Sequence, residues 1–106
     1  MFVESSNSGG ISESITEMTL DREFVVPNRR GLHARAAARI VEVASRYRSE
    51  IWITKDGCRV DGKSILDVLT LAAKQWCTVT IAAHGDDADE ALSALEELFK
   101  RNFDET

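Results

Sequence analysis

Segments in which apolar residues recur at every second position alternate along this chain with segments in which they recur every three or four positions. This alternation limits the fold more than any other feature of the sequence. It predicts strands at residues 20–26, 50–55, 58–62 and 78–83, and helices at residues 34–47, 64–74 and from 86 or 87 onward. The order βαββαβα favours an α+β domain in which one sheet carries three helices on a single face. A ferredoxin-like plait begins with the same six elements, so the order alone leaves the topology open.

Turn and cap residues mark the ends of these elements. Pro27, the only proline of the chain, ends the first strand because its ring removes a backbone donor. The pair Asp56-Gly57 predicts a tight hairpin turn between the second and third strands. Ser64 is expected to cap the second helix, and Asp86 or Asp87 is expected to cap the third.

A chain of 106 residues suits one domain. Residues 1–19 are rich in Ser, Glu and Gly and are predicted to form a flexible tail, which leaves residues 20–106 as the domain. No apolar stretch is long enough to cross a bilayer, and no Lys or Arg precedes Arg22, which argues against a signal peptide. Cys58 and Cys77 lack the close spacing of a metal site. We therefore expect a cytoplasmic protein with reduced thiols and no membrane insertion. We also expect a monomer with no metal and no cofactor.

Positive charge is concentrated in one part of this acidic chain. The formal net charge is -5, but residues 28–48 contain six arginines and a single acid, Glu42. The arginines are Arg29, Arg30, Arg35, Arg39, Arg46 and Arg48. Such a cluster indicates either a solvated basic helix face or a site for an anion or an acidic partner. Charge alone does not decide between these two interpretations.

His33 stands where the arginine-rich turn becomes a helix. The first turn of a helix leaves backbone N–H groups without internal partners, so the amides of Ala34 and Arg35 could hold an anion there. The Arg35 guanidinium could grip a phosphate with two hydrogen bonds. Imidazole titrates close to neutral pH, so its neutral form is available to attack phosphorus. The alternative is a histidine that only caps the helix, and the local pattern leaves both open.

The stretch NRRGLHARAAA, from Asn28 to Ala38, closely resembles the active-site signature of HPr, the histidine-containing phosphocarrier of the phosphoenolpyruvate-dependent phosphotransferase system. The segment DGKSI, from Asp61 to Ile65, is similar to the regulatory serine motif of that family. The segment AAHGDDADEAL is similar to the stretch that opens its last helix. The resemblance covers about residues 20–101 in the same order and spacing.

This resemblance implies an open-faced β-sandwich with a four-stranded antiparallel sheet. It implies that His33 accepts a phosphoryl group on Nδ1 from enzyme I and passes it to an EIIA-type domain. Arg35 would bind the phosphate together with the amides of Ala34 and Arg35. The protein would then be a stoichiometric carrier in sugar transport or a related branch, and not an enzyme.

The second predicted helix is more apolar than a helix buried on one side needs to be. Val68, Leu71 and Ala72 are expected to face the core. Exposed members among Ile65, Leu66 and Leu69 would mark a partner surface. We expect Arg39 of the first helix to belong to the same surface. A helix buried on two sides is the alternative. In the HPr family this region contacts enzyme I and other partners, which favours the exposed interpretation.

Ser64 has two possible roles. As an N-cap it would stabilise the second helix by about 1 kcal/mol. The DGKSI resemblance adds that an HPr kinase/phosphorylase could phosphorylate it. A phosphate there would add about -1.5 to -2 charges and repel an acidic partner without refolding the domain.

Two positions depart from the HPr pattern. Ala36 replaces a proline in the first turn of the helix, and we expect the helix to form with a less rigid entry. Trp76 stands where the family usually has a glycine, which predicts an altered turn or a new surface contact. These departures leave room for an HPr-like regulatory module that acts by docking, with His33 as a vestige.

Two other functions fit less well. Nucleic-acid binding could use the arginines, but the net charge is negative and no aromatic stacking platform is evident. A metal site built from His33, His84, Cys58 and Cys77 lacks any short ligand spacing.

Overall fold

The computed structural model describes residues 18–105, which form four strands, three α-helices and a short C-terminal turn. Along the chain these are β1 (Met18–Val25), α1 (Ala34–Ala44), β2 (Glu50–Lys55), β3 (Cys58–Asp61), α2 (Ile65–Thr70), β4 (Thr78–Gly85), α3 (Ala88–Lys100) and η2 (Asn102–Asp104). The predicted tail lies outside the described residues up to position 17. Met18 and Thr19 belong to β1, because their pairing with β4 continues to Gly85.

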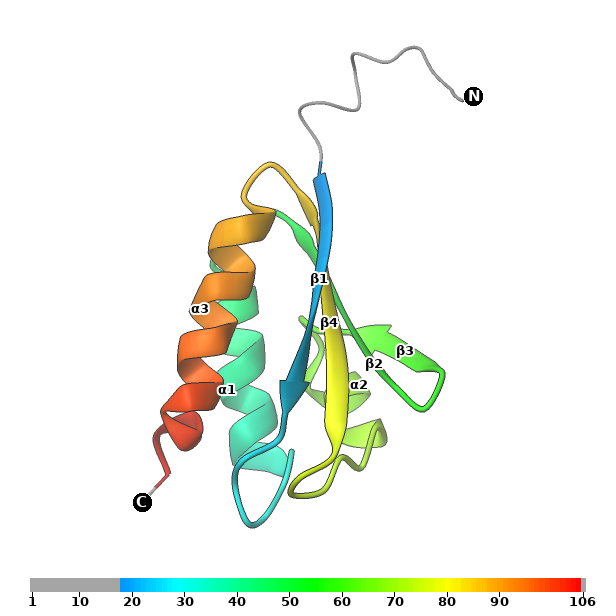
Figure 1. Cartoon of the computed structure of the whole chain (residues 1–106), viewed down its shortest axis with the longest axis vertical. Helices are drawn as coiled ribbons and strands as arrows, with labels where there is room; N and C mark the ends of the chain where they lie inside the picture. Colours follow the sequence, from blue (N-terminus) through cyan, green and yellow to red (C-terminus); the bar gives the residue numbers. More distant parts are fainter. Residues whose placement is uncertain (1–17, 106) are drawn as a thin grey trace.

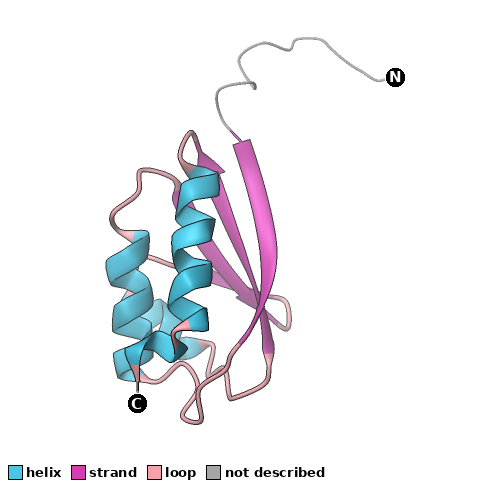
Figure 2. Ribbon diagram, turned by 60° about the vertical axis from the view of Figure 1, so that its left-hand side comes forward, coloured by secondary structure: helices cyan, strands magenta, loops and turns pink. Residues whose placement is uncertain are grey.

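The strands form one antiparallel sheet in the order β1-β4-β2-β3 (Figure 1). The central strand β4 pairs with β1 on one side and with β2 on the other, while β2 and β3 form a hairpin. The helices lie on one face of this sheet, as Figure 2 shows. The predicted α+β open-faced sandwich is therefore confirmed, and the topology that element order left open is settled.

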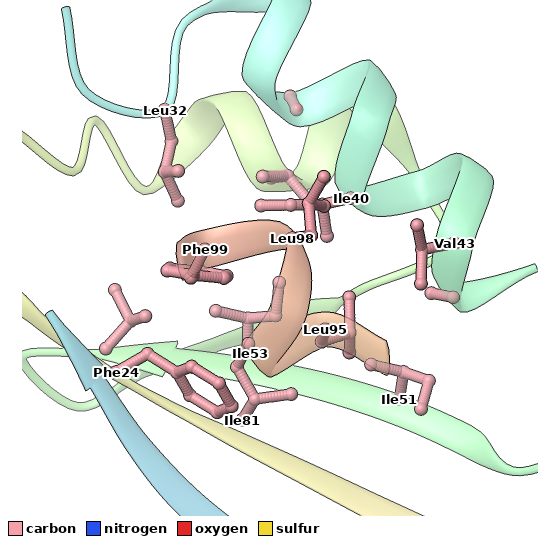
Figure 3. Close-up of a cluster of buried hydrophobic side chains, with 14 of the residues drawn as sticks. Phe24, Leu32, Ile40, Val43, Ile51, Ile53, Ile81, Leu95, Leu98 and Phe99 are labelled. Carbon is pink, nitrogen blue, oxygen red and sulfur yellow. The ribbon is translucent and has the colours of Figure 1, made fainter. Parts of the chain in front are cut away.

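The core lies between the sheet and the helices (Figure 3). Alternate residues of the strands, such as Ile51, Ile53 and Ile81, point toward the helices and are fully buried. Two phenylalanines connect the edge strand to the last helix, because the rings of Phe24 and Phe99 lie 4.9 Å apart. This packing fixes α1 and α3 against the sheet.

Two helices are shorter than the sequence predicts. α1 ends at Ala44, after which Tyr47 is held by a tighter turn through a hydrogen bond from its amide to the Ala44 carbonyl. α2 ends at Thr70 because Ala72 adopts a positive φ of 49°, which a right-handed helix does not allow. As a result Ala72 is exposed, and its prediction as a core residue was wrong, whereas Val68 and Leu71 are buried.

The predicted cap of the last helix also differs. Asp87 occupies the N-cap position of α3, but its side chain makes no capping hydrogen bond. The carboxylate instead accepts hydrogen bonds from the amides of Arg48 and Ser49 and from the Ser49 hydroxyl. It therefore ties the loop after α1 to the loop after β4. Between residues 18 and 105, no helix is long and apolar enough to span a bilayer.

Candidate functional site

His33 is the N-cap residue of α1. Its extended backbone (φ -76°, ψ -176°) precedes the first helical residue, and its Nδ1 atom accepts a hydrogen bond of 3.3 Å from the Arg35 amide. The turn before it needs glycine for two reasons. Gly31 has a φ of 69°, and a Cβ at this position would lie only 2.3 Å from the Ala73 carbonyl oxygen. The Leu32 amide donates to that same carbonyl, so the turn before His33 is fixed against the segment after α2.

Glu105 is a site residue that sequence reasoning missed. Its Oε2 atom lies 2.7 Å from Nε2 of His33, and both side chains are less than one-fifth exposed. Burial raises the pKa of Glu105, but hydrogen bonds from His33 and Asn28 and the positive charges of His33 and Arg35 outweigh burial and hold the pKa below its ordinary value. The carboxylate is therefore ionised near neutral pH.

The contact with Glu105 determines which ring nitrogen of His33 carries the hydrogen. An ionised carboxylate only accepts hydrogen bonds, so Nε2 must carry the hydrogen. In the neutral ring the lone pair is then on Nδ1, consistent with the hydrogen bond that Nδ1 accepts from the Arg35 amide. The geometry thus leaves Nδ1, at the N-terminus of α1, as the ring nitrogen that carries the lone pair.

Asn28 holds Glu105 in place from the other side of the turn. Its Nδ2 atom donates to the Gly31 carbonyl at 2.7 Å and to the two Glu105 oxygens at 3.2 and 3.3 Å. The side chain is almost fully buried, and its Oδ1 atom makes no hydrogen bond in the described part of the chain. Asn28 therefore links the turn before His33 to the carboxylate that contacts the ring.

The turn η2 brings Glu105 to the histidine. Residues 102–104 all have positive φ values, from 56° to 61°, a conformation that costs about 1 kcal/mol or more per residue. Phe103 offsets this cost because its ring is fully buried and lies 4.7 Å from the Phe99 ring. A buried phenylalanine among charged residues was the only signal in the sequence that this segment returns to the domain.

The structure divides the six clustered arginines into two groups. Arg39 and Arg46 pair with Glu42 at 3.7 and 3.9 Å, and Arg48 pairs with Asp86 at 3.0 Å. The other three, which make no ion pair within residues 18–105, are Arg29, Arg30 and Arg35. Among these six arginines, those without an ion pair therefore lie in the turn before His33 and in the first turn of α1.

The second predicted surface lies on α2. Ser64 caps this helix as expected, because its hydroxyl accepts a hydrogen bond from the Asp67 amide. Leu66 is 75% exposed and Ile65 41% exposed, whereas Leu69 is half-buried against the core. The apolar surface on this helix therefore centres on two residues.

The four residues weighed as a metal site are dispersed. Cys58 is exposed at the start of β3, Cys77 precedes β4, and His84 lies near the end of β4 next to Thr19. Among the described residues no group of three or more His, Cys, Asp or Glu side chains could hold a metal ion.

Comparison with known proteins identifies the family. The family model described as "PTS HPr component phosphorylation site" matches residues 20–101. The chain belongs to the HPr family. It is 40% identical over 86 residues to the phosphocarrier protein HPr of Xylella fastidiosa (strain 9a5c), covering 81% of this chain and 97% of that protein. It is 41% identical over 76 residues to the HPr-like protein Crh of Halalkalibacterium halodurans, covering 72% and 90%. The crystal structure of HPr from Thermoanaerobacter tengcongensis superposes with a TM-score of 0.79 at 39% identity, covering 82% of this chain and 98% of that one.

The two departures from the HPr pattern have different structural outcomes. Ala36 is buried in the first turn of α1, and the helix begins at Ala34 without a proline. Trp76 adopts the left-handed conformation that favours glycine, with a φ of 73°, and its side chain is 68% exposed. The turn therefore carries a conformational cost, and the exposed indole is not among the described residues that pack against the core to offset it.

Proposed function

We propose that this HPr family member carries a phosphoryl group on Nδ1 of His33 between enzyme I and an EIIA-type domain. The observation that supports this most directly is the contact between Nε2 and Glu105, which places the lone pair of the neutral ring on Nδ1. The unpaired Arg35 and the helix N-terminus supply the positive charge that a phosphoryl group needs.

The proposed transfer is an in-line displacement. The Nδ1 lone pair attacks phosphorus while the bond between phosphorus and the donor group of enzyme I breaks, and the electron pair of that bond stays on the donor. Positive charge develops on the imidazole and is stabilised by the Glu105 carboxylate at 2.7 Å. The Arg35 amide, which donates to Nδ1 in the free protein, is then available to a phosphate oxygen.

The chain has the role of a carrier in this scheme, and not that of an enzyme. His33 receives one phosphoryl group and must pass it to an acceptor before it can react again. The transfer to the EIIA-type domain repeats the displacement with a nucleophile of the acceptor. We infer that the carrier acts as a cytoplasmic monomer, since enzyme I and the acceptor would use the same surface in turn.

The docking surface is proposed to combine α2 with the exposed part of α1. Leu66 and Ile65 offer apolar contacts, and Leu69 contributes its exposed part. Arg39 adds a half-exposed guanidinium whose ion pair with Glu42 is long, at 3.7 Å. Ser64 begins α2, so a phosphate added there by an HPr kinase/phosphorylase would place negative charge next to these contacts. Such a change would weaken the binding of an acidic partner.

A regulatory module that acts by docking alone is the second candidate. The similarity to an HPr-like protein, Crh, is the observation that supports this second candidate. Both candidates use the α2 surface, but only the carrier requires chemistry at His33.

Intact-mass spectrometry distinguishes the two functions. The protein is incubated with phosphoenolpyruvate and the cognate enzyme I at mildly alkaline pH, beside His33→Ala and the control Arg46→Gln. The carrier predicts one acid-labile phosphoryl group on wild type and on Arg46→Gln, and none on His33→Ala. An unmodified wild type, with an enzyme I that phosphorylates another HPr in the same tube, would refute the carrier and favour the docking module.

A further inference from the structure

A polar hollow of about 530 Å³ lies beside the His33 site. Its walls come from the turn after β1, the segment before β4 and the C-terminal turn: Pro27, Arg29, Arg30, Gln75, Asn102 and Glu105. The first two segments are joined by a hydrogen bond of 3.1 Å from Gln75 to the Pro27 carbonyl, and they lie together at the foot of the domain in Figure 1. Its volume falls in the range of small-molecule sites.

The charge of this hollow favours an anion. Arg29 and Arg30 are exposed and have no carboxylate partner in residues 18–105. Glu105 also lines the hollow, and its negative charge is shared with His33 and Asn28 and is outnumbered by the two arginines. Two guanidinium groups are therefore free to bind one ligand, and the guanidinium fork matches the oxygens of a phosphate.

The other polar groups of the hollow can bind hydroxyl groups. The Gln75 amide nitrogen donates to Pro27, which leaves its side-chain oxygen as an acceptor. The side-chain amide of Asn102 makes no hydrogen bond within the described residues, and it offers both a donor and an acceptor. A ligand with hydroxyl groups would satisfy both amides, whereas a bare anion would leave them to water.

We propose that this hollow is a binding site for a small phosphorylated molecule that carries hydroxyl groups. Its phosphate binds Arg29 and Arg30, and its hydroxyl groups bind Gln75 and Asn102. This site is distinct from the place of the phosphoryl group on His33, which is served by Arg35 and the amides of α1.

The same site has a regulatory consequence that rests on the proposed carrier function. Glu105 belongs both to the wall of the hollow and to the contact with His33. A phosphorylated ligand also adds negative charge beside the position that an incoming phosphoryl group must reach. The ligand therefore slows phosphorylation of His33 without touching the histidine.

The binding test is an NMR titration of the full chain with glucose 6-phosphate, beside inorganic phosphate and glucose as matched probes. We expect glucose 6-phosphate to bind more tightly than either probe, with shifts at residues 27–30, 75 and 102. The double variant Arg29→Gln/Arg30→Gln should bind at least about tenfold more weakly. Arg46→Gln, which removes another exposed guanidinium from the turn after α1, should leave the affinity unchanged.

Several results would overturn the site. One is the absence of shifts at millimolar glucose 6-phosphate, and another is binding that the double variant does not weaken. Equal affinity for inorganic phosphate would refute the role of the hydroxyl groups. Loss of binding only in Arg35→Gln would place the anion at His33 and not in the hollow.

A rate measurement separates this inference from the carrier proposal. Saturating glucose 6-phosphate should slow phosphorylation of wild type several-fold and leave the double variant unaffected. An unchanged wild-type rate would refute the regulation. Binding that persists in a protein that enzyme I never phosphorylates would refute the carrier function and leave the binding site standing.

Discussion

Replacing Glu105 by glutamine tests how the domain prepares His33 for reaction. Glutamine keeps the size of the side chain and can still accept a hydrogen bond from Nε2, but it removes the negative charge 2.7 Å from the ring. The proposed displacement makes the ring positive, so the charge of Glu105 should matter more in the transition state than in the free protein. We expect Glu105→Gln to fold and to accept the phosphoryl group more slowly.

The size of the effect follows from the kind of hydrogen bond. A bond to a charged group contributes about 1.5–3 kcal/mol and a neutral one about 1 kcal/mol. Because the two side chains are only 19% and 14% exposed, little of the difference is lost to solvent screening. A loss of about 1 kcal/mol in the transition state corresponds to about a fivefold slower transfer.

Quenched-flow phosphorylation by enzyme I, followed by mass spectrometry, measures this rate. Glu90→Gln is the matched control, because it removes one exposed carboxylate from the first turn of α3. A Glu105→Gln rate within error of both wild type and Glu90→Gln would refute the argument that this carboxylate stabilises the charged ring.

The same carboxylate predicts a pH dependence of stability. Because folding lowers the pKa of Glu105, its contribution to the free energy of unfolding is complete above its ordinary pKa of 4.5 and is lost as the pH falls through the folded value. The free energies of unfolding of wild type and Glu105→Gln, measured with urea, should therefore converge as the pH falls below 4.5. A stability difference that grows in acid would contradict the direction of this shift.

Three further predictions concern the scaffold. Hydrogen bonds from the Ser49 hydroxyl and from the amides of Arg48 and Ser49 lower the pKa of Asp87. Asp87→Asn should therefore lose less free energy of unfolding than wild type as the pH falls below 3.8, as urea unfolding at several pH values can measure. Equal losses in the two proteins would contradict this prediction. Trp76→Gly removes the conformational cost of a left-handed tryptophan and should raise the free energy of unfolding by about 1 kcal/mol. The control Trp52→Gly, which places a glycine in β2, should lower it. A destabilised Trp76→Gly would show that the indole contributes packing. Phe103→Ala should lower the free energy of unfolding by about 3–5 kcal/mol, as thermal unfolding can measure. If the NMR signal of His33 in this variant matched that of wild type, Phe103 would have no role in positioning Glu105.

The elements of this fold could be predicted because their signals are local. Alternation at residues 50–55 and the cap at Ser64 each depend on a few neighbouring positions, and both were confirmed. The end of α2 was missed because helix-favouring alanines continue past it, and the close contact between Gly31 and Ala73 overrides their propensity. Such a tertiary contact leaves no periodic trace in the sequence.

The same distinction applies to the site. His33 and Arg35 stand in one short motif, so the sequence was enough to propose them. Glu105 is 72 positions away from His33, and no spacing rule connects the two. Asn28 was noticed only as part of the motif, because its role depends on the carboxylate it holds.

The left-handed turn that returns Glu105 to His33 has a consequence for the nascent chain. On the ribosome, the histidine and its arginines emerge long before the carboxylate that prepares them. Under the proposed carrier function, the full rate of phosphoryl transfer is therefore reached only when residues 102–105 close onto the domain.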